Sequence, residues 1–254
     1  LDLAMRGWSV LNRPVTKENL EQARPLFERA LVIAPELPKA MVGLARTLSA
    51  AASAHMSAAP EDDLARADEA VTRVLARLPN HAMAHFVKGE ILVTRKQFDA
   101  AIDEYRAAIA NDHSLAPAYG AIGRAMIRAG RAEEAFAPLE AAIRLSPRDP
   151  ALNIWYFSIC HAHSHLAHDE AAVEWCNRAV ATGPYWVAYV DLASAYAWQG
   201  HEAEAHAAVI KLRELVPGYT VDRWAHEGWS DDPTFLAQYE RITAGLRKAG
   251  LPET

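Results

Sequence analysis

Several features that commonly assign a function are rare or missing in this chain of 254 residues. It has only two cysteines, Cys160 and Cys176, too few for a secreted fold held together by disulfides. We therefore expect free, buried thiols and a reducing, cytoplasmic location. No segment approaches the roughly 20 consecutive apolar residues of a membrane span, and no charged and then apolar leader opens the chain. The sequence thus predicts no interaction with a membrane.

Basic charge is also scarce, with 26 Lys and Arg against 32 Asp and Glu and no strongly basic run. Binding of nucleic acid through phosphate neutralisation is therefore not expected. Catalytic motifs are missing as well: there is no nucleophile elbow, phosphate-binding glycine loop or His-Glu-x-x-His pattern. The acidic clusters at 61–63 and 231–232 precede predicted helices and are explained as caps. We predict a protein that is not an enzyme and that needs no cofactor.

What the sequence does contain is an internal repeat. Gly89 and Ala108 recur 34 residues later as Gly123 and Ala142, and the apolar positions between them recur with the same spacing. This is the period of tetratricopeptide (TPR) repeats, each a pair of antiparallel helices. Two helices approach closely only where a small residue removes the side chain. We therefore predict that Gly89 and Gly123 lie at helix crossings.

The repeat predicts an all-α fold, a right-handed TPR-type α-solenoid. About six helix-turn-helix repeats are expected over residues 1–217, followed by C-terminal capping helices over residues 218–254. The fifth repeat needs a register shift of three residues, because Phe157 would otherwise take a slot that must be small. After the shift Cys160 fills that slot and Cys176 fills the facing one.

The capping helices have clear start signals. Thr220 is suited to cap a short helix, and Asp232 followed by Pro233 is suited to begin the last helix, which is expected to end at Gly250. A solenoid must cover its last apolar face, so this segment is predicted to do that.

Four segments give the chain a closer resemblance: 85–89, 145–150, 155–156 and 245–252. They resemble the TPR region that follows the catalytic domain in bacterial class III adenylate cyclase-like signalling proteins; similar regions follow winged-helix DNA-binding domains. The resemblance implies a cytoplasmic regulatory or partner-binding module, without the cyclase activity, and family members carry Gly in place of Cys160. The chain begins at Leu1 rather than methionine, so we expect it to be part of a longer polypeptide.

A histidine-rich stretch follows Cys160 and has the residue types of a metal site. The repeat register places His163 in a buried core slot and His168 in the turn after the helix. It leaves His161 and His165 exposed on the face that lines the concave groove.

Two histidines four residues apart can hold a metal ion together with a third ligand. The corresponding groove positions of the preceding repeat are Arg124 and Arg128, whose charges would oppose a divalent cation. We therefore predict no physiological metal site at His161 and His165.

In a TPR solenoid the first helices of successive repeats line a concave groove. Here the centre of that groove is basic and its flanks are aromatic, which suits an extended or helical peptide with acidic and apolar side chains. The Lys and Asn arrangement that clamps a chaperone's terminal carboxylate is missing, so that partner is disfavoured. The alternative is that these residues are solvated or contact the chain's own cap. The predicted partner-binding residues are Arg46, Phe86, Glu90, Arg124, Ile127, Arg128, Phe157, His161, His165 and Trp198.

The leading hypothesis is a non-catalytic protein-protein interaction scaffold. Its partner would be a protein, a peptide or a neighbouring domain of the same polypeptide, which the sequence does not identify. The competing hypothesis is a homodimer formed through the repeats or through the aromatic-rich segment 224–239. A more remote alternative is a small-molecule sensor, for which the sequence names no ligand.

Overall fold

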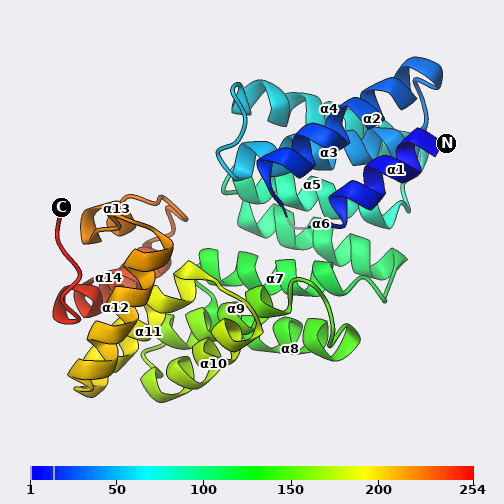
Figure 1. The fold of residues 1–254 in the computed structure, drawn as a ribbon. Coiled ribbons are helices and arrows are strands. Elements are labelled where there is room, and N and C mark those ends of the chain that lie inside the picture. The colour runs from blue at the N-terminus through cyan, green and yellow to red at the C-terminus, as the bar shows by residue number, and fades with distance from the viewer. Residues whose placement is uncertain (1, 14) are drawn as a thin grey trace. The chain divides into compact units, whose positions relative to one another are not determined.

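The fold was taken from a computed structural model, which describes residues 2–13 and 15–254. These residues are all-helical, with no β-strand among them, and they divide into two compact units, residues 1–118 and 119–254. Figure 1 shows the helices of both units. The chain has the expected all-α solenoid fold. The division between the two units lies within the first helix of the fourth repeat. It is a different boundary from the one predicted at residue 217 between repeats and cap, which stays a prediction.

The first unit consists of three helix pairs, in which each helix packs on the next along the chain. Local signals explain where the helices begin: the Thr16 side chain accepts a hydrogen bond from the backbone N–H of Asn19, and Pro38 and Pro60 occupy first positions. The helices are α1 (Asp2–Leu11), α2 (Lys17–Ile33), α3 (Pro38–Ser53), α4 (Pro60–Arg77), α5 (Ala82–Thr94) and α6 (Phe98–Asn111).

The second unit continues the pattern and then departs from it. Three further helix pairs are followed by a short and a long helix, as the capping prediction requires. The elements are α7 (Ala116–Arg128), a 3-10 turn η1 (Ala132–Ala135) with α8 (Phe136–Leu145), α9 (Leu152–His165), α10 (Asp169–Thr182), α11 (Trp186–Gln199), α12 (Glu202–Leu215), α13 (Val221–Ala225) and α14 (Pro233–Lys248).

The predicted close crossings are confirmed. A methyl group placed on Gly89 would overlap the ring of Tyr105, and one placed on Gly123 would overlap the side chain of Leu139. Each pair joins the two helices of one repeat, so the glycines let a large residue of the second helix reach the backbone of the first.

The fifth repeat differs from expectation in the state of its cysteines. Cys160 and Cys176 do face each other across α9 and α10, but they form a disulfide instead of the free thiols that the low cysteine count suggested. The crossing is close enough to bring their Cα atoms within 5.2 Å, which lies in the range that a disulfide spans. Both residues are completely buried.

The cap begins as predicted and is tied down at both ends. Thr220 accepts a hydrogen bond from the N–H of Arg223, and Asp232 accepts from the N–H groups of two residues in the first turn of α14. The backbone N–H of Val221 donates to the carbonyl of Pro252, which closes the last residues against α13. Among the described residues no helix has the length and apolar character needed to cross a membrane.

The longest cap helix, α14, packs on α11 and α9, the same helices that line the predicted groove. Gly245 allows this approach, because a methyl group there would overlap the side chains of Ser194 and Trp198 on α11. The cap therefore covers part of the groove side of the second unit, and its main contacts are with α11 and α9 rather than with α12, the last helix of the repeats.

Candidate functional site

Five of the predicted groove residues line one cavity of about 80 Å³ in the second unit. Arg124, Ile127 and Arg128 come from the last two turns of α7, and Phe157 and His161 come from α9. These helices place the five together because residues three or four apart share a helix face. We call this cavity the basic-aromatic pocket.

The C-terminal segment supplies the other wall of the basic-aromatic pocket, in line with the alternative that groove residues contact the chain's own cap. Trp224 of α13, Trp229 of the following loop and Phe235 of α14 line it, as does Tyr185 just before α11. Burial raises the pKa of Tyr185 although Arg124 and other positive charge oppose the rise, so its hydroxyl stays neutral. The pocket thus has aromatic walls and a basic rim.

The two arginines of the basic-aromatic pocket are in different states. The guanidinium of Arg128 lies over the ring of Trp229 at 5.2 Å, and its backbone carbonyl accepts a hydrogen bond of 2.6 Å from Ser230. Arg124 is exposed and makes no ion pair with any residue in 2–13 or 15–254. Arg124 is therefore the cation that can bind an acidic group without first breaking a bond.

A chain of hydrogen bonds runs from α11 through two histidines to the cap. His161 Nδ1 lies 3.0 Å from a carboxylate oxygen of Asp191, which is completely buried. His161 Nε2 lies 3.1 Å from Nε2 of His165, whose Nδ1 is 3.1 Å from Oε1 of Gln238 on α14. Each ring nitrogen thus has a partner, and the chain ties α9 to α11 and α14.

The predicted exposure of the histidines was wrong for two of the three. His165 is buried, because α14 lies over it and Phe235 packs against its ring. Burial, with the neighbouring His161, lowers its pKa well below the ordinary value of 6.5. His163 is only half-buried and packs on Phe136 instead of filling a core slot. His161 lines the basic-aromatic pocket, but its side chain is only 13% exposed, less than the register predicted.

Trp198 also contacts the cap rather than an open groove. Arg241 and Lys248 of α14 lie over its ring at 4.9 and 5.3 Å, and its indole N–H donates to the carbonyl of Arg241. Trp198 and His165 therefore contact the chain's own cap, which was the alternative to partner binding for these two residues.

The three predicted residues of the first unit form a cluster of their own. The guanidinium of Arg46 lies 3.7 Å from the carboxylate of Glu90, and it also covers the rings of Phe86 and Trp8 at 5.5 and 5.9 Å. Phe86 is buried. The charge of Arg46 is therefore already engaged within the unit.

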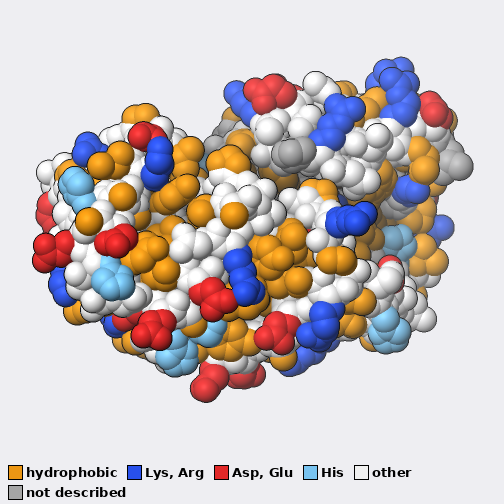
Figure 2. Space-filling model, turned by 60° about the horizontal axis from the view of Figure 1, so that its bottom comes forward, with side chains coloured by type: hydrophobic (Ala, Val, Ile, Leu, Met, Phe, Trp, Pro, Cys, Tyr) orange, Lys and Arg blue, Asp and Glu red, His pale blue; other side chains and the backbone are white. Residues whose placement is uncertain are grey.

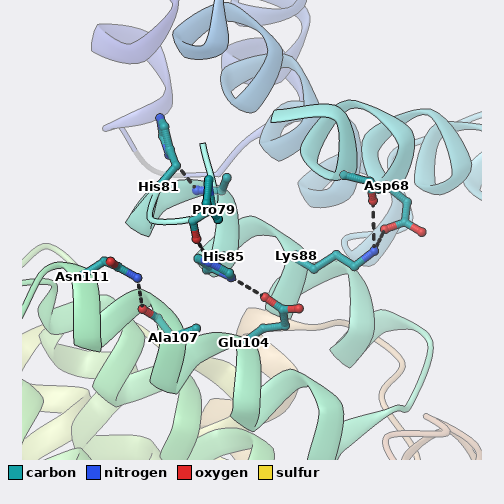
Figure 3. A network of polar contacts seen from close by, with 10 residues as sticks. Asp68, Pro79, His81, His85, Lys88, Glu104, Ala107 and Asn111 are labelled. Carbon is teal, nitrogen blue, oxygen red and sulfur yellow. Dashed lines mark hydrogen bonds and ion pairs between the residues drawn. The ribbon is translucent and has the colours of Figure 1, made fainter. Parts of the chain in front are cut away.

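A polar network that sequence reasoning missed joins α4, α5 and α6 (Figure 3). His85 contacts the carboxylate of Glu104 through Nδ1 at 2.6 Å and the carbonyl of Pro79 through Nε2 at 2.8 Å. Lys88, one turn along the same helix, forms an ion pair with Asp68. These groups are paired with one another, so the network holds the helices together and leaves no open ligand position at His85.

One cluster has the residue types of a metal centre. Cys160, Cys176 and Asp191 place possible ligand atoms within 4.8 Å of one another, and all three are buried. The two sulfurs are bonded to each other, however, and a disulfide offers no thiolate to a metal. In this state the cluster is a structural core element.

Comparison with known proteins supports the repeat architecture. Residues 57–117 match the family model described as tetratricopeptide repeat. No curated protein matches the chain in sequence. The chain is similar in structure to pilF of Pseudomonas aeruginosa, with 17% identity, a TM-score of 0.64 and coverage of 96% of each chain.

Two further solved structures share the fold. PilW, a type IV pilus biogenesis factor, is 19% identical with a TM-score of 0.60, over 80% of this chain and 96% of that one. YrrB, a TPR protein with an unusual peptide-binding site, is 16% identical with a TM-score of 0.54, over 76% of this chain and 93% of that one. At such identities the likeness concerns the fold.

Proposed function

We propose that the chain is a non-catalytic scaffold that binds a partner through the concave side of its repeats. The partner segment is acidic and partly apolar, and belongs to another protein or to a neighbouring domain of the same polypeptide. The observation that carries the proposal is Arg124, an exposed cation without an ion-pair partner among the described residues, at the rim of an aromatic-walled pocket. The tetratricopeptide architecture supports it, since TPR proteins mediate protein-protein interactions.

The chemistry of the basic-aromatic pocket suits such a partner. An arginine binds a carboxylate with two parallel hydrogen bonds, which gives direction as well as attraction. Aromatic side chains such as Phe157 and Trp229 supply the apolar area that most often dominates binding energy at interfaces. On the face shown in Figure 2, acidic and basic side chains alternate around hydrophobic patches without forming a continuous basic strip. That face therefore offers no basic strip along which a nucleic-acid backbone could lie.

We propose in addition that the module works in a bacterial signalling protein in the cytoplasm. This context rests on the resemblance of the segments at 85–89, 145–150, 155–156 and 245–252 to the TPR regions of adenylate cyclase-like proteins. The disulfide between Cys160 and Cys176 removes the argument for a reducing compartment that the low cysteine count had offered.

The alternative of a homodimer has two candidate surfaces, the repeats and the aromatic-rich segment 224–239. Trp224, Phe235 and Tyr239 of that segment are buried inside the second unit, whereas Leu236 is exposed. Self-association through either surface stays a prediction, and sedimentation velocity at several concentrations tests it: a monomer throughout excludes it.

Selection from a random-peptide display library tests the proposed function. The immobilised chain should enrich sequences that combine Asp or Glu with aromatic or aliphatic residues. The Arg124→Glu variant should not enrich them, whereas Arg144→Glu, which changes an exposed arginine on α8, should enrich the same set. Enrichment by Arg124→Glu equal to that of the unmodified chain would exclude the basic-aromatic pocket as the binding surface.

A further inference from the structure

We propose that the basic-aromatic pocket binds a small organic acid, a single planar ring that carries a carboxylate. The proposal uses the same surface as the proposed function, but it does not require a protein partner. It makes the second unit a receptor for a free aromatic acid, with the C-terminal segment as one wall of the receptor.

The first argument is the shape of the site. An open TPR groove admits a continuous peptide, but here Trp224, Trp229 and Phe235 stand opposite α7 and α9 and narrow the site to a half-open cavity of about 80 Å³. A space of that size holds several waters or part of a ring whose remainder lies at the open rim, whereas a helical segment does not fit. The narrowed site therefore favours a compact ligand.

The second argument is the charge of the lining. Two arginines line the basic-aromatic pocket, and no Asp or Glu does. The nearest buried carboxylate on α11, that of Asp191, is held by His161 and is not part of the lining. Arg124 has no ion-pair partner among the described residues, so its guanidinium is available to an anion.

The third argument is an unused donor. Trp224 lines the pocket, and its buried indole Nε1 has no hydrogen-bond partner within residues 2–13 and 15–254. Buried N–H groups of this kind nearly always have an acceptor. A carboxylate in the pocket is an acceptor of the kind that this N–H lacks, and Arg124, which also lines the pocket, supplies the opposite charge.

The fourth argument concerns the body of the ligand. Phe157 and Tyr185 meet edge to face at 4.9 Å, and Phe235 and the ring face of His161 complete an apolar wall. Both nitrogens of His161 are occupied, so it adds no free polar group. Flat rings pack well against such walls, whereas a strongly hydrated phosphate loses its hydration there without enough donors to replace it.

Indole N–H signals of the ¹⁵N-labelled chain provide the test. The chain has seven tryptophans, and the Trp224→Phe variant identifies the signal of Trp224. Titration with phenylacetate should shift the Trp224 and Trp229 signals to saturation with a Kd of about 1 mM or tighter. The neutral isostere 2-phenylethanol should give no saturable shift.

Two variants make the test specific. Arg124→Gln should weaken phenylacetate binding about tenfold, and Arg144→Gln on α8 should leave it unchanged. Equal shifts with 2-phenylethanol, no loss in Arg124→Gln, or no saturable shift at all would overturn the proposal. Since Arg124 is exposed, its replacement is not expected to disturb folding.

A short peptide with blocked ends that contains Glu and Phe distinguishes the two sources of the carboxylate. If phenylacetate binds and this peptide does not, the ligand is a free acid. The small-molecule site is then supported and the proposed function is contradicted. If the peptide shifts the Trp224 signal and phenylacetate does not, the proposed function stands and the small-molecule site is overturned.

Discussion

The guanidinium of Arg241 donates two parallel hydrogen bonds to the carboxylate of Asp169, at 2.9 and 2.7 Å. The two residues are 72 positions apart, and their pairing joins the cap helix α14 to the start of α10. This contact and the close approach at Gly245 keep the cap on the groove side of the second unit. They explain why the C-terminal segment forms one wall of the basic-aromatic pocket.

Replacing Arg241 by Gln should destabilise the second unit by about 1–3 kcal/mol, because the bidentate, partly buried ion pair with Asp169 is lost. The control is Arg247→Gln, whose exposed pairs with Glu240 and Glu253 should contribute much less because solvent screens them. Urea unfolding measures both. Equal effects of the two variants would show that the Asp169 contact does not hold the cap.

Replacing Gly123 by Leu should overpack the crossing with Leu139 and cost about 1–3 kcal/mol. A lower melting temperature is the expected result. Gly183→Ala is the control, because a methyl group there would meet only Asn153, at an ordinary contact distance of 3.6 Å. A melting temperature unchanged by Gly123→Leu would contradict the repeat register.

Acid should destabilise the fold through His165. Its pKa is low in the folded protein and ordinary in the unfolded chain, so below about pH 6.5 the unfolded chain binds a proton that the folded protein does not. Stability is therefore fully present above that pH and falls as the pH decreases, by at most about 1.4 kcal/mol per pH unit for this one group.

The pH prediction is tested by comparing the unmodified chain with His165→Gln between about pH 7.5 and pH 5.5. His81 and His163 also have lowered pKa values, mainly from burial, and they contribute equally to both proteins. The unmodified chain should lose more stability on acidification than the variant. Parallel curves would mean that His165 is not buried in the neutral form.

The disulfide predicts a specific result with alkylating reagent. In denaturant without reductant, mass spectrometry should find neither Cys160 nor Cys176 alkylated. After reduction, both should be alkylated. Since the bond closes a loop with a sequence separation of 16, reduction should lower stability by about 3 kcal/mol. Two alkylated thiols before reduction would restore the expectation of free cysteines.

The solenoid was predictable because its constraints are local and repeat. Gly89 and Gly123 show the close crossings at a fixed period, and the start of α14 follows from the capping preferences of Asp232 and Pro233. The shifted register of the fifth repeat correctly placed Cys160 opposite Cys176.

The pocket was only half predictable. The repeat register indicated that Arg124, Arg128 and Phe157 share the groove side, but an amphipathic cap helix does not reveal which surface it covers. The signal that was overlooked is Gly245, a small residue within α14 that allows close approach to α11. Without that contact, His165 was wrongly expected to be exposed.

The affinity of a selected acidic peptide for the unmodified chain and for Arg124→Glu tests the central claim most directly. Fluorescence anisotropy with the labelled peptide should show binding at least about 30-fold weaker for the variant, equivalent to about 2 kcal/mol, with an almost unchanged melting temperature. Arg144→Glu should bind like the unmodified chain. Equal affinity of Arg124→Glu and the unmodified chain would contradict the claim that the partner binds at the basic-aromatic pocket.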